Sequence, residues 1–233
     1  MGLFLSLSGI INKSEKEVAN ALEKYLKSVD GGLELANIDN SHRNFCVIKE
    51  DNGNTTIFYP EYFLKWEQCS DFLSKELRAP VFSLHIYDGD FWTYTLFFNG
   101  EIKDKFMPIP DYFNEDVSQE EIDGWKGSSK IVASYVPGLV QENIEKYLVR
   151  WDLDQEESKA YEDDEFTNCD WQLVDFMKKL KLPYPIDDNG NSLGQIYKFW
   201  SKDIPLTEIP IGPFIVNAQT SFPMNKKPWW KFW

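Results

Sequence analysis

The stretch VFSLHIYDGDFWTYTLFFNGEIKDKF, residues 81–106, decides the fold. It is rich in aromatic and β-branched residues, and it contains the dipeptides Asp88-Gly89 and Asn99-Gly100. Each dipeptide is typical of a two-residue hairpin loop, because a type I′ turn needs positive φ at both central residues. The stretch therefore predicts three antiparallel strands that follow one another in a meander.

Two-residue loops would also fix which side chains share a face of this meander. The expected cross-strand pairs are Tyr87–Asp90, His85–Trp92, Ser83–Tyr94, Phe97–Ile102 and Thr93–Phe106. One face is then apolar and forms the core: Phe82, Leu84, Ile86, Phe91, Phe97, Ile102 and Phe106. The other face carries rings and polar groups: Ser83, His85, Tyr87, Asp90, Trp92, Tyr94, Lys103 and Lys105.

This second face has two interpretations. Flat rings with polar groups between them can bind a sugar, a base or a peptide, so His85, Trp92 and Tyr94 are a candidate ligand face. Alternatively, helices from the second half of the chain cover its aromatic part and leave the lysines at the rim.

The elements before the meander alternate in type. Residues 3–11 are typical of a buried strand, and Ser14 with Glu17 forms a capping box that begins a helix ending at Gly31-Gly32. Residues 45–49 and 55–59 predict a hairpin, and residues 66–77 predict a second helix. Residues 33–43 are expected to be a polar loop. The order β-α-β-β-α-β is that of a ferredoxin-like unit, and it predicts an α+β sheet unit over residues 1–110.

The second half of the chain is predicted to be helical and to pack on the sheet, as part of the same core. Short helices are expected at 118–125 and 130–135, and longer ones at 139–151 and 170–180. Residues 111–202 thus form an acidic helical half. Prolines recur after residue 203, so residues 203–233 are expected to be an extended arm with an aromatic C-terminal tail.

Charge is unevenly distributed along the chain. The net charge is −14, and residues 111–170 hold 17 Asp or Glu against five Lys or Arg. Such a surface repels nucleic acid and attracts a basic protein. The acidic residues expected to bind such a partner lie close together: Asp152, Asp154, Glu156, Glu157, Glu162, Asp163, Asp164 and Glu165. The alternative is a solvated helical face.

The C-terminal tail is a second candidate contact. Trp229, Trp230, Phe232 and Trp233 stand among three lysines at the end of the arm. These rings could pack on the protein's own core, on a partner or at a membrane interface, and the anionic body disfavours the membrane.

Cysteine usage and hydropathy indicate a cytoplasmic protein. Cys46, Cys69 and Cys169 are far apart and form no CxxC pair, which disfavours a disulfide framework and favours a reducing compartment. The apolar or helical context of Cys46 and Cys69 is typical of buried thiols. The apolar run at residues 1–11 is too short to cross a bilayer.

No sequence motif supports a catalytic, cofactor or metal site. The chain has no GxSxG and no phosphate-binding loop, and its only two histidines are His42 and His85. His85, Asp88 and Asp90 have the residue types of metal ligands, but the turn engages Asp88 and separates it from His85.

Two hypotheses follow. The first is a non-enzymatic protein-interaction module that binds a basic partner, as small acidic bacterial immunity or inhibitor proteins do; the likeness is one of charge and size. The second is a small-ligand-binding or hydrolytic domain centred on His85, Trp92 and Tyr94.

Overall fold

A computed structural model describes residues 3–36, 45–114, 116–151, 169–187, 190–202 and 204. The helices are α1 (Glu15–Ser28), α2 (Trp66–Leu77), α3 (Gln119–Asp123), α4 (Ser129–Tyr135), α5 (Glu142–Glu145) and α6 (Cys169–Lys179). The strands are β1 (Leu5–Ile10), β2 (Gly32–Leu35), β3 (Phe45–Asp51), β4 (Asn54–Phe58), β5 (Val81–Tyr87), β6 (Phe91–Phe98), β7 (Glu101–Phe106) and β8 (Gln195–Trp200). The fold class is α+β, as predicted.

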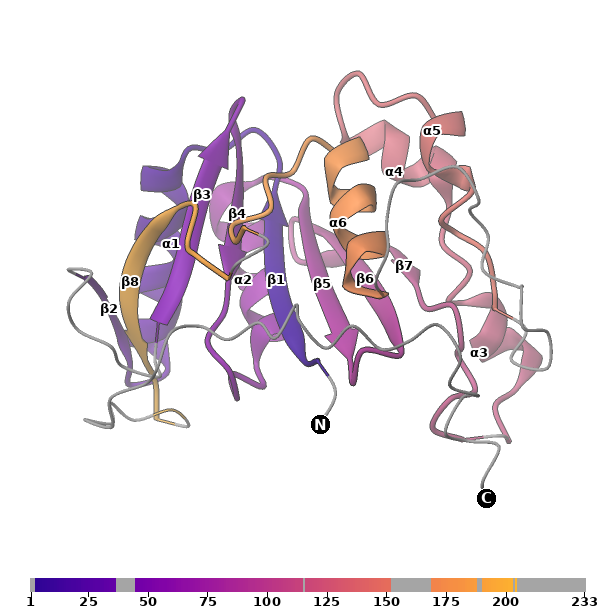
Figure 1. Ribbon diagram of the computed structural model, residues 1–233, viewed down its shortest axis with the longest axis horizontal. Helices are drawn as coiled ribbons and strands as arrows, with labels where there is room; N and C mark the ends of the chain where they lie inside the picture. Colours follow the sequence, from indigo (N-terminus) through magenta and orange to yellow (C-terminus); the bar gives the residue numbers. More distant parts are fainter. Residues whose placement is uncertain are drawn as a thin grey trace.

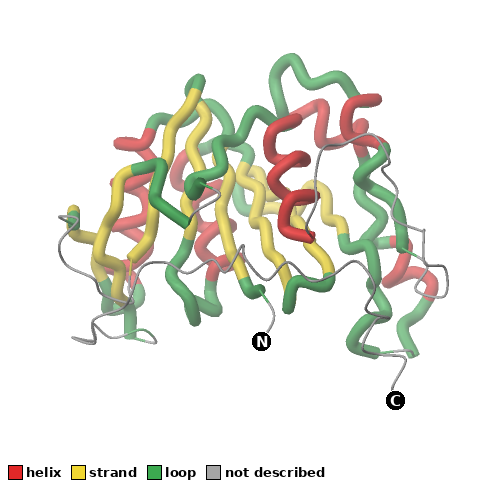
Figure 2. The backbone as a smooth tube through the Cα atoms, in the orientation of Figure 1, coloured by secondary structure: helices red, strands yellow, loops and turns green. Residues whose placement is uncertain are grey.

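All the strands of the described ranges form one antiparallel sheet in the order β2-β8-β3-β4-β1-β5-β6-β7. Helices α1 and α2 lie on one face, and α6 lies on the other, with α4 and α5 beside it (Figures 1 and 2). The predicted β-α-β-β order is confirmed at the N-terminus, with one more strand, β2, inserted after α1 where a loop was expected.

The sheet separates two hydrophobic cores, as the alternation of strand side chains requires. In β1, Leu7 is buried in the core below α6, whereas Ile10 is buried in the core below α1 and α2. Gly9 has no side chain, and a Cβ placed there would lie 2.4 Å from Leu182 Cδ1. Leu182 follows α6, so this glycine allows the α6 segment to approach β1 closely.

The capping and periodicity signals in the sequence predicted most of the helices correctly. Ser14 accepts a hydrogen bond from the Glu17 N–H, and the Glu17 carboxylate accepts one from the Ser14 N–H, so the predicted capping box is present. Helices α2, α3, α4 and α6 also lie where periodicity placed them. The long helix expected at 139–151 is reduced to α5, because hydrogen bonds around it join residues three apart and break the α-helical ladder.

The predicted pairing between β5 and β6 is wrong by one residue. Asp88 and Gly89 have φ values of 50° and 74°, and the Asp90 N–H donates to the Tyr87 carbonyl at 2.9 Å, so the turn itself forms as expected. Pairing then begins at Tyr87–Phe91, which leaves Asp90 as an extra, bulged residue. A one-residue shift exchanges the two faces of the following strand.

The shift places the large rings of β6 in the core. Trp92 now pairs with Ile86 and Tyr94 with Leu84, and both rings are almost completely buried. Burying the Trp92 and Tyr94 rings stabilises the fold more than a regular two-residue loop would, because each ring removes a large apolar area from water.

The second turn keeps its predicted form, but pairing also shifts beyond it. Phe97 pairs with Ile102 as expected, and a register shift between Leu96 and Phe97 then brings Phe106 opposite Tyr94 instead of Thr93. Ile102, expected in the core, is 58% exposed. It lies on β7, the edge strand of the sheet.

The segment predicted to be helical contributes a strand that its sequence did not reveal. β8 pairs with β2 on one side and β3 on the other, so the sheet combines residues from both halves of the chain. No helix in the described ranges has the length and apolar character needed to cross a membrane.

Candidate functional site

The structure separates the three residues of the predicted ligand face. His85 lies on the face of the sheet that carries α1 and α2, where its ring stacks on Trp66 at 4.4 Å between centroids. Trp92 and Tyr94 lie on the opposite face. Both rings pack on Phe176 of α6, at 4.8 and 5.5 Å. Helix α6 therefore covers the aromatic part of β6, as the alternative interpretation proposed.

The polar end of Tyr94 has a structural partner. Its hydroxyl donates to Asp104 Oδ2 at 2.5 Å, and the Ser128 N–H donates to the same oxygen at 2.9 Å. Burial raises the pKa of both Tyr94 and Asp104. This partly buried pair connects β6 and β7 to Ser128, the residue that caps α4.

His85 is partly buried and held by a neighbouring strand. Ser6 Oγ lies 3.0 Å from His85 Nδ1, within hydrogen-bond distance. Burial lowers the pKa of the imidazole to about 4, and a backbone hydrogen bond with Leu5 opposes that shift. An imidazole with this pKa is neutral at pH 7 and a weak base.

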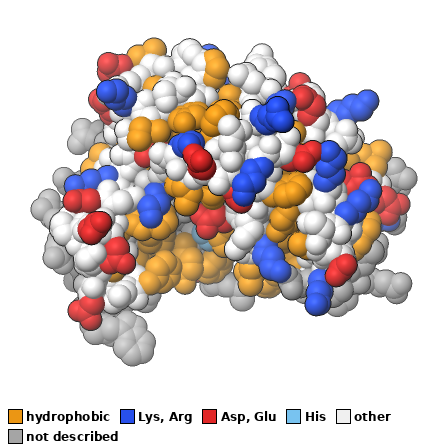
Figure 3. Space-filling model, turned by 180° about the vertical axis from the view of Figure 1, so that it is seen from behind, with side chains coloured by type: hydrophobic (Ala, Val, Ile, Leu, Met, Phe, Trp, Pro, Cys, Tyr) orange, Lys and Arg blue, Asp and Glu red, His pale blue; other side chains and the backbone are white. Residues whose placement is uncertain are grey.

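A group of six aromatic side chains surrounds the end of β5, and we call it the aromatic surface. Tyr87 is its centre: the Phe4 and Phe113 rings meet it edge-on at 5.1 and 4.8 Å. Its members come from four separate segments: Phe4, Trp66, His85, Tyr87, Tyr112 and Phe113. Figure 3 shows the molecule from the side that carries α1 and α2. Hydrophobic side chains gather at the lower centre of this view, around a hollow in which the histidine colour appears.

The aromatic surface is both exposed and ordered by polar contacts. Phe4 is 50% exposed and Phe113 is 63% exposed. The Tyr112 hydroxyl donates to Asp90 Oδ2 at 2.6 Å, and the Gly89 N–H donates to the Leu3 carbonyl at 2.8 Å. The bulged turn of β5 and β6 thus anchors the segments that carry Phe4 and Phe113. These contacts hold the exposed rings of Phe4 and Phe113 beside Tyr87.

Sequence reasoning found His85 and Tyr87 but not their neighbours. Phe4, Trp66 and Tyr112 lie far from residue 85 in the chain, and only the pairing of β1 with β5 and the position of α2 bring them together. The adjacent aromatics Tyr112 and Phe113, placed after Pro110 outside any predicted helix, were the one available signal.

Two hollows elsewhere on the described surface involve other residues. One, of about 430 Å³, lies between α1 and β2 and includes Glu15, Leu35 and Tyr197. The other, of about 490 Å³, lies beside α3 and includes Ile122, Trp125 and Leu148. Neither is lined by His85, Trp92 or Tyr94. Within the described ranges no three His, Cys, Asp or Glu side chains group as they would to hold a metal ion.

Two cysteines, Cys46 and Cys69, are buried, as predicted. Cys46 and Cys69 are free thiols with no solvent exposure. Burial raises the pKa of Cys69 to about 12 and raises that of Cys46 further. A hydroxyl network lies in the same core: Ser8 Oγ is 2.7 Å from both Tyr59 Oη and Ser70 Oγ.

These thiols are expected to be unreactive in the folded protein. A rise of about three pKa units leaves roughly a thousandfold less thiolate, the reactive species. In a Cys169→Ser background, reaction with a disulfide reagent at pH 8 should be at least a hundredfold slower in the native protein than in 8 M urea. Rapid labelling of the native protein would show that at least one of the two sites is accessible.

The predicted partner-binding residues lie outside the described part of the chain. They are the acidic residues Asp152, Asp154, Glu156, Glu157, Glu162, Asp163, Asp164 and Glu165, and the tail residues Trp229, Trp230, Phe232 and Trp233. Comparison of the chain with family models, with curated proteins and with solved structures finds no match.

Proposed function

We propose that this protein is a non-enzymatic interaction module that binds a basic protein partner, as immunity and inhibitor proteins do. Negative charge is concentrated in residues 111–170, which contain 17 acidic and five basic residues. Charge collected on one part of a surface accelerates association with an oppositely charged partner and selects against acidic ones.

The observation that carries this proposal is the exposure of the described carboxylates in that region. Six acidic side chains between residues 116 and 145 are exposed to solvent: Asp116, Glu120, Glu121, Asp123, Glu142 and Glu145. The ion pairs described for this region lie at the surface: Lys126–Asp123 and Arg150–Asp111, each at 2.6 Å. Exposed pairs of this kind contribute little stability and exchange readily for contacts with a partner.

The test compares two variants that remove the same charge from different places. One carries Asp163→Asn, Asp164→Asn and Glu165→Gln, and its control carries Asp30→Asn, Asp51→Asn and Glu61→Gln. A basic protein captured from a lysate at low salt is purified, and its affinity is measured at 50 and 300 mM salt. We expect the first variant to bind about tenfold more weakly, a loss of roughly 1.4 kcal/mol, and the control to change less than threefold.

The salt dependence provides a second criterion. Binding should weaken steeply between 50 and 300 mM salt, because exposed charges are screened over about 10 Å at 0.1 M. Equal weakening by both variants would mean that only net charge matters. Capture of no basic protein under any salt condition would contradict the proposal.

A further inference from the structure

The aromatic surface is an apolar site beside negative charge. Phe4, Tyr87 and Phe113 present partly exposed rings. The adjoining turn carries Asp88 and Asp90, both partly exposed. Contiguous exposed rings on a protein mark a place that another group covers. The group that fits this site has aromatic rings for edge-on and stacked contacts and positive charges for the carboxylates.

The C-terminal tail, residues 226–233, has this composition. It carries four aromatic residues, Trp229, Trp230, Phe232 and Trp233, and three lysines, Lys226, Lys227 and Lys231. The whole segment from residue 205 onward contains a single acidic side chain, Glu208. The tail is therefore a basic aromatic segment attached to a strongly acidic protein.

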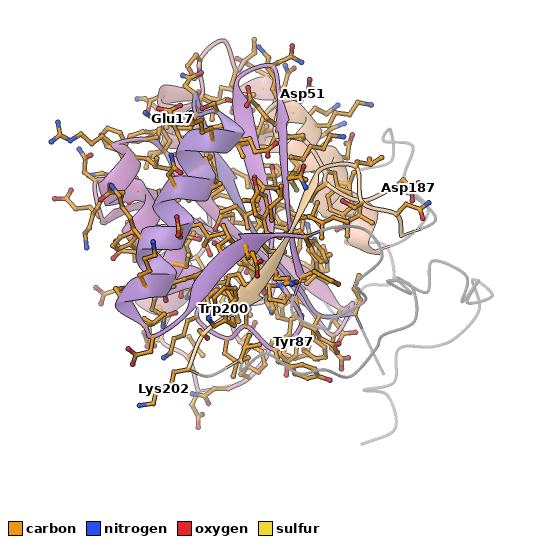
Figure 4. The ribbon with its side chains drawn as sticks, turned by 90° about the vertical axis from the view of Figure 1, so that its left-hand side faces the viewer. Glu17, Asp51, Tyr87, Asp187, Trp200 and Lys202 are labelled. Carbon is orange, nitrogen blue, oxygen red and sulfur yellow. The ribbon has the colours of Figure 1, made fainter. Side chains whose placement is uncertain are left out.

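The chain leaves the sheet at the same end as the aromatic surface. Figure 4 shows Trp200, Lys202 and Tyr87 at the lower end of the sheet, and Asp51 at the upper end. From β8 the strand order runs through β3, β4 and β1 to β5. At about 4.8 Å between neighbouring strands, β8 and β5 are roughly 19 Å apart.

The arm has the length to cover this distance. Residues 205–228 separate Ile204, the last described residue, from Trp229. A flexible chain of this length has a root-mean-square end-to-end distance of roughly 27 Å, and a proline-rich one is longer. A linker whose mean length matches the separation of its two sites gives an effective concentration in the millimolar range. A weak contact is thereby sufficient for binding within one molecule.

We propose that residues 226–233 bind the aromatic surface of the same molecule. The tryptophan and phenylalanine rings cover Phe4, Tyr87 and Phe113, and the lysines lie near Asp88 and Asp90. This contact does not use the acidic residues proposed to bind the basic partner. It assigns the tail rings, which the sequence left open between the protein's own core, a partner and a membrane, to the protein itself. It also provides a cover for four large apolar side chains that an unbound tail would expose to water.

Photo-crosslinking in the full-length chain tests this inference. A benzoylphenylalanine placed at Phe113 should crosslink to residues 229–233, with the product identified by mass spectrometry. The control probe replaces Leu35, which is 59% exposed and lies on β2, the strand next to β8. A tail that moves freely would reach the control site as readily, so a yield at least fivefold higher at position 113 is expected.

Mixing isotopically labelled and unlabelled chains identifies the source of the tail. Products within one chain support the inference, and products between a labelled and an unlabelled chain would overturn it in favour of a second copy. Absence of tail crosslinks from position 113 would also overturn it.

A charge variant provides an independent measurement. Asp88→Asn keeps the left-handed turn conformation, which Asn tolerates well, and should lower the crosslink yield about two- to threefold at low salt. No change at any salt concentration would contradict the role of the carboxylate.

Discussion

Replacement of Trp92 by alanine is expected to lower the free energy of unfolding by about 3–5 kcal/mol, as for other large rings removed from protein cores. Trp92 is 1% exposed and packs on Phe106 and Phe176, with ring centroids 5.1 and 4.8 Å away. Its truncation would leave a cavity between β6 and α6. Denaturation in urea measures the change through the midpoint and slope of the transition.

Ile102→Ala is the matched control for this experiment. Its side chain is 58% exposed, so the expected loss is below about 0.5 kcal/mol. A two-residue loop at Asp88-Gly89 and an unshifted β6–β7 ladder would reverse these roles, with Ile102 inside and Trp92 outside. A large loss for Ile102→Ala together with a small one for Trp92→Ala would therefore refute the bulged register.

The second large effect is a dependence of stability on pH that arises from His85. The pKa of its imidazole is about 4 in the folded protein, against 6.5 for an unperturbed histidine. Between these values the unfolded chain binds more protons than the folded one, so stability rises with pH. The contribution is complete above pH 6.5 and is lost as the pH falls toward 4. With a reduction for partial exposure, it amounts to about 2–3 kcal/mol.

His85→Gln isolates this contribution, because glutamine does not titrate. The free energy of unfolding of both proteins is measured from pH 7 to pH 4. The wild-type protein should lose about 2–3 kcal/mol more than the variant across this range, and the carboxylates common to both cancel in the difference. Parallel curves for the two proteins would show that the folded imidazole titrates normally.

The sequence predicted those features of the fold that depend on residues close together in the chain. The capping box at Ser14 and Glu17, the meander and the positions of most helices follow from residues close together in the chain. It did not predict β8 or the bulge at Asp90, because both depend on partners far away. Asp90 accepts a hydrogen bond from the Tyr112 hydroxyl, and β8 pairs with β2 and β3.

The candidate site was predictable only in part for the same reason. Strand alternation identified His85 and Tyr87 as residues of one face, and the structure keeps them together. One bulged residue was enough to move Trp92 and Tyr94 to the other side of the sheet. Trp66 and Phe4 approach His85 and Tyr87 through tertiary packing, which no local pattern in this chain encodes.

The position of β8 has a consequence for the order of folding. Phe45 pairs with Lys198, and among the strands that the structure describes β2 pairs with β8 alone. A ribosome must therefore release nearly 200 residues before β3 gains its second neighbour and β2 gains its first. Contacts over such a long sequence separation close slowly. Until then the nascent chain presents β3 as an open sheet edge, the kind of surface on which chaperones act and from which aggregation begins.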